Sequence, residues 1–349
     1  MDPAALLESL VSVPSVSGAE GPLADHLQGL LASLGFRVER RGANLWFETR
    51  GTGPRILFLS HLDTVPPCDG WKQDPFRPAW SGESLTGLGA NDAKGCVAAL
   101  VLAAQEARDT DGARAVFAFV AGEEVGGKGI REILPELGRL DAAVVGEPTG
   151  LEVCTAQRGM LVLRCAARGE AAHVAHAALG ENAVHKAARD ILKLADLRFE
   201  PHPLLGETRA QTTTIQGGRA RNQVPDACEF FVDLRLTPNL DACALAERFA
   251  RELESEVAIH SLRYQAVSTD PSEPVVVAAL AASPAKAPKG SATASDWAFL
   301  SHLPAVKAGP GDTHRSHRPD EWIALSEVLA GRDFYASLLR GYAREAGRG

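Results

Sequence analysis

The length, composition and charge of the chain narrow the classes of protein to which it can belong. It has 349 residues, of which 45% are hydrophobic and 23% charged, and its formal net charge at pH 7 is −8. These values are typical of a globular protein with two domains. The negative charge disfavours a nucleic-acid or anionic-membrane partner, because both would repel it.

The N-terminus and the cysteines bear on where the protein works. The opening MDPAALLESL is acidic and amphipathic, unlike a signal peptide, and the chain lacks an apolar run of the roughly eighteen residues that span a bilayer. Its six cysteines are scattered, without a CxxC pair, in a chain too long to be a disulfide scaffold. We therefore expect a cytoplasmic protein with reduced thiols and no membrane partner.

The first 150 residues alternate between helical and strand patterns. Residues 56–59 and 116–120 are continuous apolar runs, which indicates strands covered on both faces, as in a parallel sheet. The predicted helices here are 2–13, 19–34 and one that ends near 106, and the other predicted strands are 36–40, 45–49 and a short run before Glu147.

From about residue 157 the predicted strands alternate between apolar and polar residues, so one face of each strand is exposed to solvent. Such strands are typical of an antiparallel sheet. The predicted strands are 160–168, 212–216, 227–236 and 258–265, with helices at 182–194 and 240–254. A helix at 273–282, a strand at 305–308 and a helix at 325–344 follow. We predict an α/β fold, in which 1–156 and 267–349 form a mixed, mostly parallel sheet flanked by helices. Residues 157–266 form an inserted antiparallel α+β domain.

Histidine and carboxylate side chains recur at strand and helix ends of the first domain. In parallel α/β sheets such ends lie along one edge, where sites collect. Each residue alone has a plain explanation: Asp92 fits an N-cap, and Glu123 with Glu124 fits a solvated acidic pair. The repeated placement favours one shared site. The residues are His61, Asp63, Asp92, Glu123, Glu124 and Glu147, and the loop 309–321, dense in His, Arg and Asp, is a further candidate.

Carboxylate and imidazole ligands without cysteine suit Zn²⁺, with Co²⁺ or Mn²⁺ as alternatives. A pair of such ions about 3.5–4 Å apart needs one bridging carboxylate, terminal ligands on each side and a shared water. The set would allow Asp92 to bridge, His61 and Glu147 to bind one ion, and Glu124 and His317 to bind the other. Glu123 is then left as a general base that takes a proton from the water and passes it to the leaving amine. Asp63 could orient His61.

Five motifs resemble those of the M20 co-catalytic metallopeptidase family, in the same order and over nearly the whole chain. They are SHLDT, GLGANDAKG, VAGEEVGG, GEPTG and RSHRPDE. The family includes acetylornithine deacetylase, succinyl-diaminopimelate desuccinylase, acetyl-lysine deacetylase, carboxypeptidases and aminoacylase. The resemblance implies the same five metal ligands, Asp63 as the acid that orients a ligand, and Glu123 as the base. His314 lies three residues before His317, and the match of His-x-Pro-Asp-Glu to the family pattern favours His317 as the ligand.

The resemblance extends to the inserted domain and implies that it is a lid and dimerisation domain. His173 matches a family histidine that commonly reaches the partner subunit's site to stabilise the oxyanion, and Asn222 matches a substrate-contacting asparagine. Two departures are Ala172, where relatives often have Gly, and His176, where many have Tyr or Arg. These matches imply a homodimer.

The substrate is less well specified than the reaction. The motifs look most similar to acetylornithine deacetylase-like members, followed by acetyl-lysine deacetylases, including those that release lysine or ornithine from an acidic carrier protein. We expect hydrolysis of an N-acyl-ornithine or N-acyl-lysine amide in arginine or lysine biosynthesis, with Arg315, Lys307 or Arg219 as candidates to hold the substrate carboxylate. The alternatives are a desuccinylase, a dipeptidase or carboxypeptidase, and, from another class, a catalytically inactive binding protein on the same fold.

Overall fold

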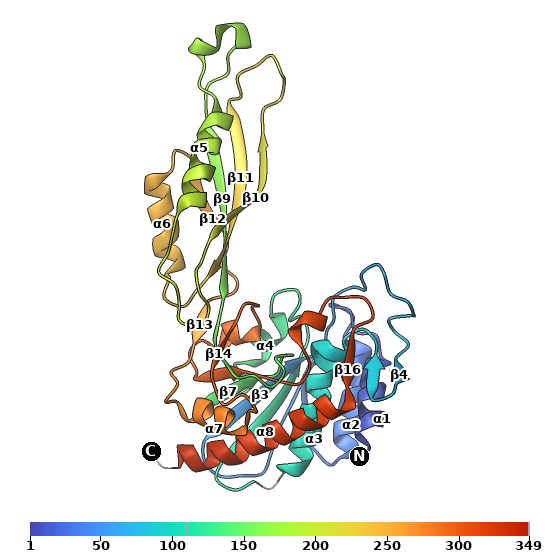
Figure 1. Ribbon diagram of the computed structural model, residues 1–349. Helices are drawn as coiled ribbons and strands as arrows, with labels where there is room; N and C mark the ends of the chain where they lie inside the picture. Colours follow the sequence, from blue (N-terminus) through green and yellow to red (C-terminus); the bar gives the residue numbers. More distant parts are fainter. Residues whose placement is uncertain (109, 348–349) are drawn as a thin grey trace. The chain divides into compact units, whose positions relative to one another are not determined.

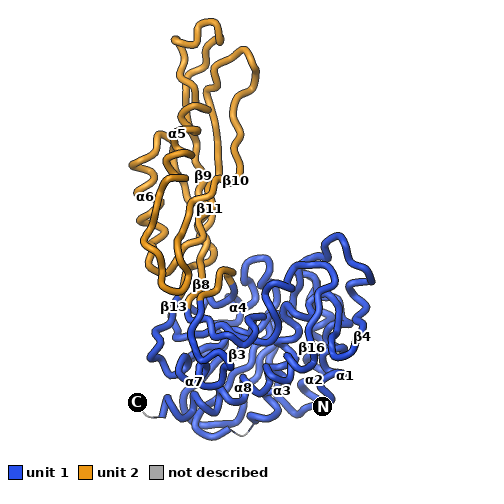
Figure 2. The backbone as a smooth tube through the Cα atoms, in the orientation of Figure 1, with its two compact units in different colours: residues 1–155, 268–289, 295–349 blue, residues 156–267, 290–294 orange. Residues whose placement is uncertain are grey.

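The computed structural model describes residues 1–108 and 110–347, which form two compact units (Figure 2). The first unit comprises 1–155, 268–289 and 295–349, and the second comprises 156–267 and 290–294. The segment 290–294, which the sequence pattern places in the first domain, therefore belongs to the second unit.

A nine-stranded sheet is the centre of the first unit, and its middle strands β6, β3, β7 and β15 are parallel. Strands β1 and β2 extend it as an antiparallel hairpin on one side, and β8 pairs antiparallel with β15 on the other. In spatial order the strands are β1 (Glu39–Arg41), β2 (Asn44–Glu48), β6 (Arg114–Val120), β3 (Arg55–His61), β7 (Ala142–Val145), β15 (Ala305–Lys307), β8 (Cys154–Gln157) and β13 (Val267–Ser268), with β14 (Lys289–Ser291) paired to β8.

Helices flank this sheet, and α3, α7 and α8 pack side by side against it (Figure 1). The helices and helical turns are α1 (Pro3–Val11), α2 (Gly21–Ser33), η1 (Ala90–Lys94), α3 (Gly95–Glu106), α4 (Lys128–Ile133), α7 (Pro274–Ala282), η3 (Asp296–Leu300), η4 (Thr313–Arg315) and α8 (Leu325–Ala346). Helix α1 begins as the sequence predicts, because Asp2 accepts the N–H groups of Ala4 and Ala5 ahead of a first-turn proline. Among the described residues, no helix has both the length and the apolar character of a membrane span.

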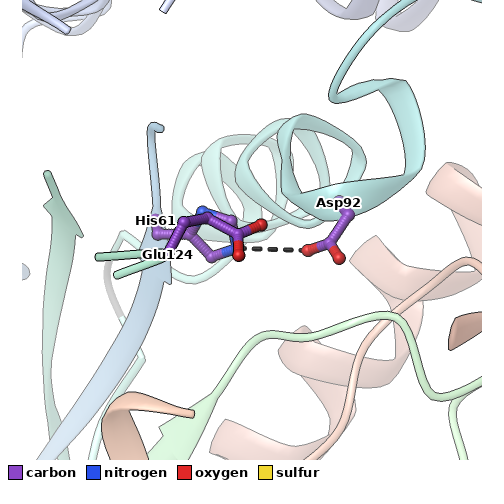
Figure 3. A group of neighbouring side chains, drawn as sticks. All are labelled: His61, Asp92 and Glu124. Atoms are coloured by element: carbon purple, nitrogen blue, oxygen red, sulfur yellow. Dashed lines mark hydrogen bonds and ion pairs between the residues drawn. The ribbon is translucent and has the colours of Figure 1, made fainter. Parts of the chain in front are cut away.

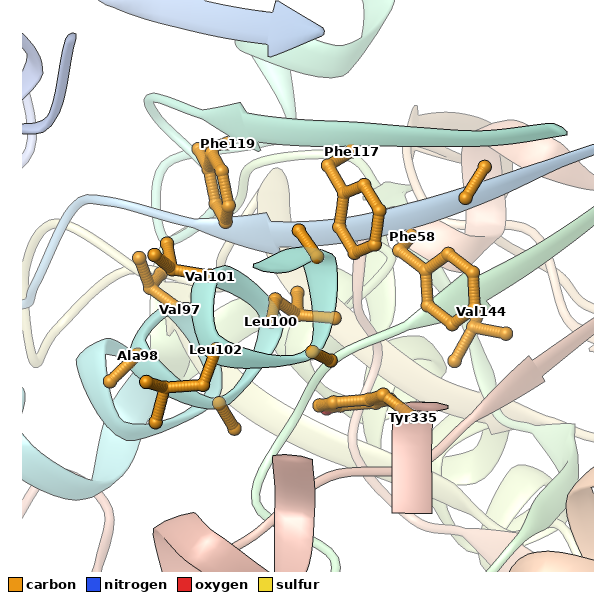
Figure 4. Close-up of a cluster of buried hydrophobic side chains, with 14 of the residues drawn as sticks. Phe58, Val97, Ala98, Leu100, Val101, Leu102, Phe117, Phe119, Val144 and Tyr335 are labelled. Carbon is orange, nitrogen blue, oxygen red and sulfur yellow. The ribbon is translucent and has the colours of Figure 1, made fainter. Parts of the chain in front are cut away.

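The core of the first unit packs against the middle of the parallel strands (Figure 4). The rings of Phe58 on β3 and Phe117 on β6 stack with their centroids 5.1 Å apart, and Tyr335 of α8 meets Phe58 edge-on. The Tyr335 hydroxyl donates a hydrogen bond to the carbonyl of Ala308, just past β15. Each such aromatic side chain contributes about 1.5–3 kcal/mol through burial, so this packing stabilises the strands that lead to the site.

A small sheet formed by β4 (Ala79–Ser81), β5 (Ser84–Thr86) and β16 (Trp322–Ala324) lies beside the main one and was not predicted. Strand β16 pairs with β5 across more than 200 residues of sequence, with Ile323 opposite Leu85. The pairing connects residues 84–86 to residues 322–324, which follow the loop 309–321.

The second unit is an antiparallel sheet of four strands with its own core. Burial alternates along the central strand β11, as the sequence pattern predicts for a sheet with one wet face. In spatial order the strands are β10 (Ala210–Gly217), β11 (Ala227–Leu236), β9 (Gly159–Arg168) and β12 (Glu256–Ser261); the helices are η2 (Val174–Leu179), α5 (Ala183–Asp196) and α6 (Ala242–Glu252). The predicted fold class is confirmed: a mixed, mostly parallel sheet flanked by helices, with a separate antiparallel α+β unit.

Candidate metal centre

Three parallel strands bring predicted site residues to one edge of the main sheet. His61 is the last residue of β3, Glu123 and Glu124 follow β6, and Glu147 follows β7. Strand β3 lies between the other two, with His61 opposite Val120 in the register. Because the three strands run in the same direction, their carboxyl ends and the residues that follow lie together.

Ligand-type atoms of His61, Asp92 and Glu124 all lie within 4.8 Å of one another (Figure 3). The two oxygens of Asp92 face different histidines, with Oδ1 3.1 Å from Nε2 of His61 and Oδ2 3.8 Å from Nε2 of His317. His317 Nε2 also lies 2.8 Å from Oε1 of Glu124. Asp92 thus lies between His61 and the His317–Glu124 pair, a position that would suit a bridging carboxylate.

Asp63 forms hydrogen bonds both with His61 and with the turn that carries Glu123 and Glu124. The Nδ1 atom of His61 is 2.9 Å from the main-chain oxygen of Asp63 and 3.5 Å from its carboxylate, so the backbone oxygen is the nearer acceptor. The carboxylate accepts the N–H groups of Glu123 and Glu124 at 3.0 and 3.1 Å and the hydroxyl of Ser17 at 2.7 Å. Asp63 therefore turns Nε2 of His61 toward Asp92 and fixes the backbone of the two glutamates.

The histidines of the cluster favour the charged form beside these acids. Burial lowers the pKa of His61, but its hydrogen bonds with Asp63 and Asp92 outweigh this and raise the pKa well above its usual value. The hydrogen bond with Glu124 raises the pKa of His317 to about 9, against the opposing effect of burial. For Asp92, burial raises the pKa, and the hydrogen bond and charge of His61 more than reverse this, so the pKa is lowered. The cluster thus attracts positive charge.

Buried acids surround the cluster and repel one another. Burial, together with the charge of Glu147, raises the pKa of Glu123 well above its usual value. Burial also raises the pKa of Glu147 to about 7, although Lys307 and His61 act in the opposite direction. Such an excess of buried negative charge favours protonated acids or bound cations. With imidazole and carboxylate donors and no thiolate among them, the set fits a pair of divalent cations.

Sequence reasoning missed Asp296, at the start of η3. This side chain is 2% exposed, and neither of its carboxylate oxygens has a hydrogen-bond partner among the described residues. Burial and the charges of Glu147 and Asp63 raise its pKa to about 8, although His61 opposes this. Its Oδ1 would lie 2.6 Å from a Cβ added to Gly127, so it packs directly under the turn that carries the two glutamates. A single acid in a short helical turn has no periodicity that would identify it.

The three basic side chains that were predicted to hold the substrate carboxylate already interact with other residues of the protein. The guanidinium of Arg315 donates to Glu327 at 2.7 Å and lies 3.7 Å above the ring centroid of Trp322. Lys307 is 3% exposed and lowers the pKa of Glu147 through its charge, and Arg219, in the second unit, lies 3.9 Å from Asp226. Their roles in substrate binding remain predictions.

His173 and Asn222 lie side by side in the second unit. The N–H of Val174, next to His173, donates to the carbonyl of Asn222 at 3.1 Å. Both residues are exposed, and Nδ1 of His173 accepts the N–H of Ala175 at 3.1 Å, which leaves Nε2 facing away from the backbone. Their predicted roles toward substrate are not tested by this arrangement.

Comparison with known proteins places the chain in a family. The sequence model of peptidase family M20/M25/M40 matches residues 57–341. Succinyl-diaminopimelate desuccinylases from Sphingopyxis alaskensis and Delftia acidovorans are 31% and 29% identical to the chain, over 97% of this chain and 98% of each relative.

Solved structures share the fold. Aminopeptidase PepT from Bacillus cereus superposes with a TM-score of 0.80 at 22% identity, covering 98% of both chains. The Bacillus subtilis YXEP protein, described as a dinuclear metal-binding peptidase of the M20 family, superposes with a TM-score of 0.76 at 16% identity, covering 97% of this chain and 96% of the other. The match of the family model and of full-length relatives shows that the chain belongs to peptidase family M20/M25/M40 and is a metallohydrolase that acts on amides.

Proposed function

We propose that the protein uses two divalent cations to hydrolyse the amide of an N-acylated amino acid, and that its substrate class is N-succinylated diamino acids such as N-succinyl-diaminopimelate. The observation that carries the reaction is the position of Asp92 between His61 and the His317–Glu124 pair. The relatives named as desuccinylases support the succinyl group and a place in lysine biosynthesis.

In this proposal each protein group has a separate task. His61 and Glu147 would hold one ion, Glu124 and His317 would hold the other, and Asp92 would contribute its carboxylate to both. The ions, when bound, would polarise the substrate carbonyl and acidify the attacking water. Glu123, fixed through its main-chain N–H by Asp63, takes the proton from that water and delivers it to the leaving nitrogen.

N-acetylornithine is the second candidate substrate. The motifs from GEPTG to PDEWI resemble acetylornithine deacetylase-like members, and the catalytic groups would act on either amide. The two candidates differ at both ends, because the succinyl group carries a free carboxylate that acetyl lacks and diaminopimelate carries one more carboxylate than ornithine, and cationic side chains must accept these groups. A panel of N-succinyl-diaminopimelate, N-acetylornithine, N-acetyl-lysine and dipeptides, each with Zn²⁺, Co²⁺ or Mn²⁺, separates them through kcat/KM.

The variant Glu123→Gln tests the reaction itself. We expect kcat to fall by about 100- to 10,000-fold, because a positioned proton-transfer group is lost, while elemental analysis still finds two ions per chain. Glu124→Gln is the matched variant, and it should lose metal as well as activity. Full activity in Glu123→Gln or in chelator-stripped protein would overturn the proposal, whereas no turnover on any substrate would favour the inactive binding protein.

A further inference from the structure

Glu321 joins the segment of His317 to the turn of Asp92. Its carboxylate accepts three main-chain N–H groups, from Gly89 at 3.0 Å and from Asn91 and Asp92 at 2.8 Å each. The side chain is 3% exposed, so these bonds are shielded from water. About 230 residues of sequence separate the donors from the acceptor.

Asn91 makes the reciprocal connection. Its Oδ1 accepts the N–H of Asp312 at 2.9 Å, and its Nδ2 donates to the carbonyl of Asp312 at 3.0 Å and to the hydroxyl of Ser316 at 3.2 Å. The contact requires glycine at 311, because a Cβ there would lie 2.4 Å from Oδ1 of Asn91. Each segment thus contributes a buried side chain that satisfies main-chain groups of the other.

Regular secondary structure does not hold the two candidate ligands of this region. Asp92 has φ −124° and ψ 95° within η1, outside the helical region, and His317 has a φ of +59°. A positive φ is unfavourable for any residue other than glycine, and it persists only where the surroundings impose it. The Asn91 and Glu321 side chains therefore help to fix one ligand segment against the other, beside the main-chain bond from the N–H of Gly87 to the carbonyl of Glu321 and the pairing of β16 with β5.

We infer that Glu321 and Asn91 are positioning residues that set the separation of Asp92 and His317 before an ion binds. The inference rests on the proposed function, because it assumes that these two residues are metal ligands. Its physical basis is that a pre-formed site does not lose affinity to the ordering of its own backbone. Partners that orient metal ligands in this way typically account for about 10- to 100-fold in metal affinity.

The test measures Co²⁺ affinity by chelator competition in wild-type protein and in Glu321→Gln. In this variant the side-chain amide oxygen can still accept the N–H groups of Asn91 and Asp92, which meet Oε1 of Glu321. The amide NH₂ group then faces the N–H of Gly89, which loses its acceptor. We expect one of the two ions to bind about 10- to 100-fold more weakly, and activity to return at high Co²⁺ because every catalytic group remains. Asn91→Ala breaks the other half of the connection and tests the inference independently if Glu321→Gln does not fold.

Asp190→Asn is the matched control. Asp190 is also a buried acid that joins distant segments, since its carboxylate accepts the N–H groups of Glu254 at 3.0 Å and Ser255 at 2.8 Å, but it lies in the second unit. It should lower the melting temperature and leave both Co²⁺ affinities unchanged. Glu321→Gln and Asn91→Ala variants that bind two ions with wild-type affinity would overturn the inference alone. Wild-type protein that binds no metal would overturn the proposed function and the inference with it.

Discussion

The protons on His317 and Glu147 link metal uptake to pH. Hydrogen bonding to Glu124 raises the pKa of His317 to about 9, and burial raises the pKa of Glu147 to about 7. A metal ion binds the neutral imidazole and the charged carboxylate, so it must displace the proton from each. In metal-free protein both groups are protonated below pH 7, and His317 keeps its proton up to about pH 9.

We therefore predict that the apparent affinity for the two ions together rises from pH 6 to pH 9 and rises more steeply below pH 7. Each displaced proton contributes about a tenfold change in affinity per pH unit. Titration calorimetry in buffers of different ionisation enthalpy would count the released protons directly. His314→Ala, on the same loop and exposed, is the control and should keep the wild-type slope. A pH-independent affinity for both ions would mean that neither group is a metal ligand.

At the scale of elements, helix α4 approaches the end of β6 so closely that only glycine fits at 129. The N–H of Gly129 donates to the carbonyl of Ala121 at 3.0 Å. A Cβ at Gly129 would lie 2.3 Å from that carbonyl oxygen and 2.4 Å from Oδ1 of Asn44, which accepts the N–H of Ala121. The close approach braces the turn that carries Glu123 and Glu124.

Gly129→Ala should lower the free energy of unfolding by about 1–3 kcal/mol, because the new methyl group must push main-chain atoms apart. Metal affinity should fall as well, since the displaced backbone leads directly to Glu124. Gly29→Ala is the matched control: Gly29 is exposed in α2 with no atom within 4 Å of the added Cβ. It should raise stability by about 0.5–1 kcal/mol. Urea denaturation of both variants distinguishes these results, and equal stabilities would contradict the account of α4.

The elements that could be predicted from the sequence are those with a local pattern of their own, either a continuous apolar run or an alternation of apolar and polar residues. Strand β3 and strand β6 are apolar runs, and β11 alternates over its full length. Strands β4, β5 and β16 have three residues each and form by pairing, much of it with distant sequence, so no local pattern marks them. Helix α4, six residues in a glycine-rich segment, was missed for a similar reason.

The same distinction holds in the candidate site. His61, Glu123 and Glu147 could be placed together because parallel strands end at one edge, which needs only the strand order. Asp296 and Glu321 could not, because their neighbours in space are about 170 to 230 residues away and a lone acid has no period. Non-local packing determines what these two acids do.

At the scale of the whole molecule, the second unit has an open sheet edge. Strand β10 is at the edge of its sheet, and most of its residues are exposed, including Ile215 at 50%. An edge strand with free main-chain groups can pair with another chain. The exposed segment with His173 belongs to the same unit. These features support the proposal of a homodimer formed through the second unit, in which His173 reaches the partner subunit's site.

Co-expression of His173→Ala and Glu123→Gln subunits tests this arrangement. Each variant alone should be nearly inactive. If His173 acts across the dimer, a mixed dimer has one complete site, because the His173→Ala chain keeps its own Glu123 and receives His173 from its partner. Random assembly makes half of the dimers mixed, so activity should return to about a quarter of wild type. If His173 acts within its own chain, neither site of a mixed dimer is complete and no activity returns. Sedimentation of the active species as a monomer would exclude the dimer as well.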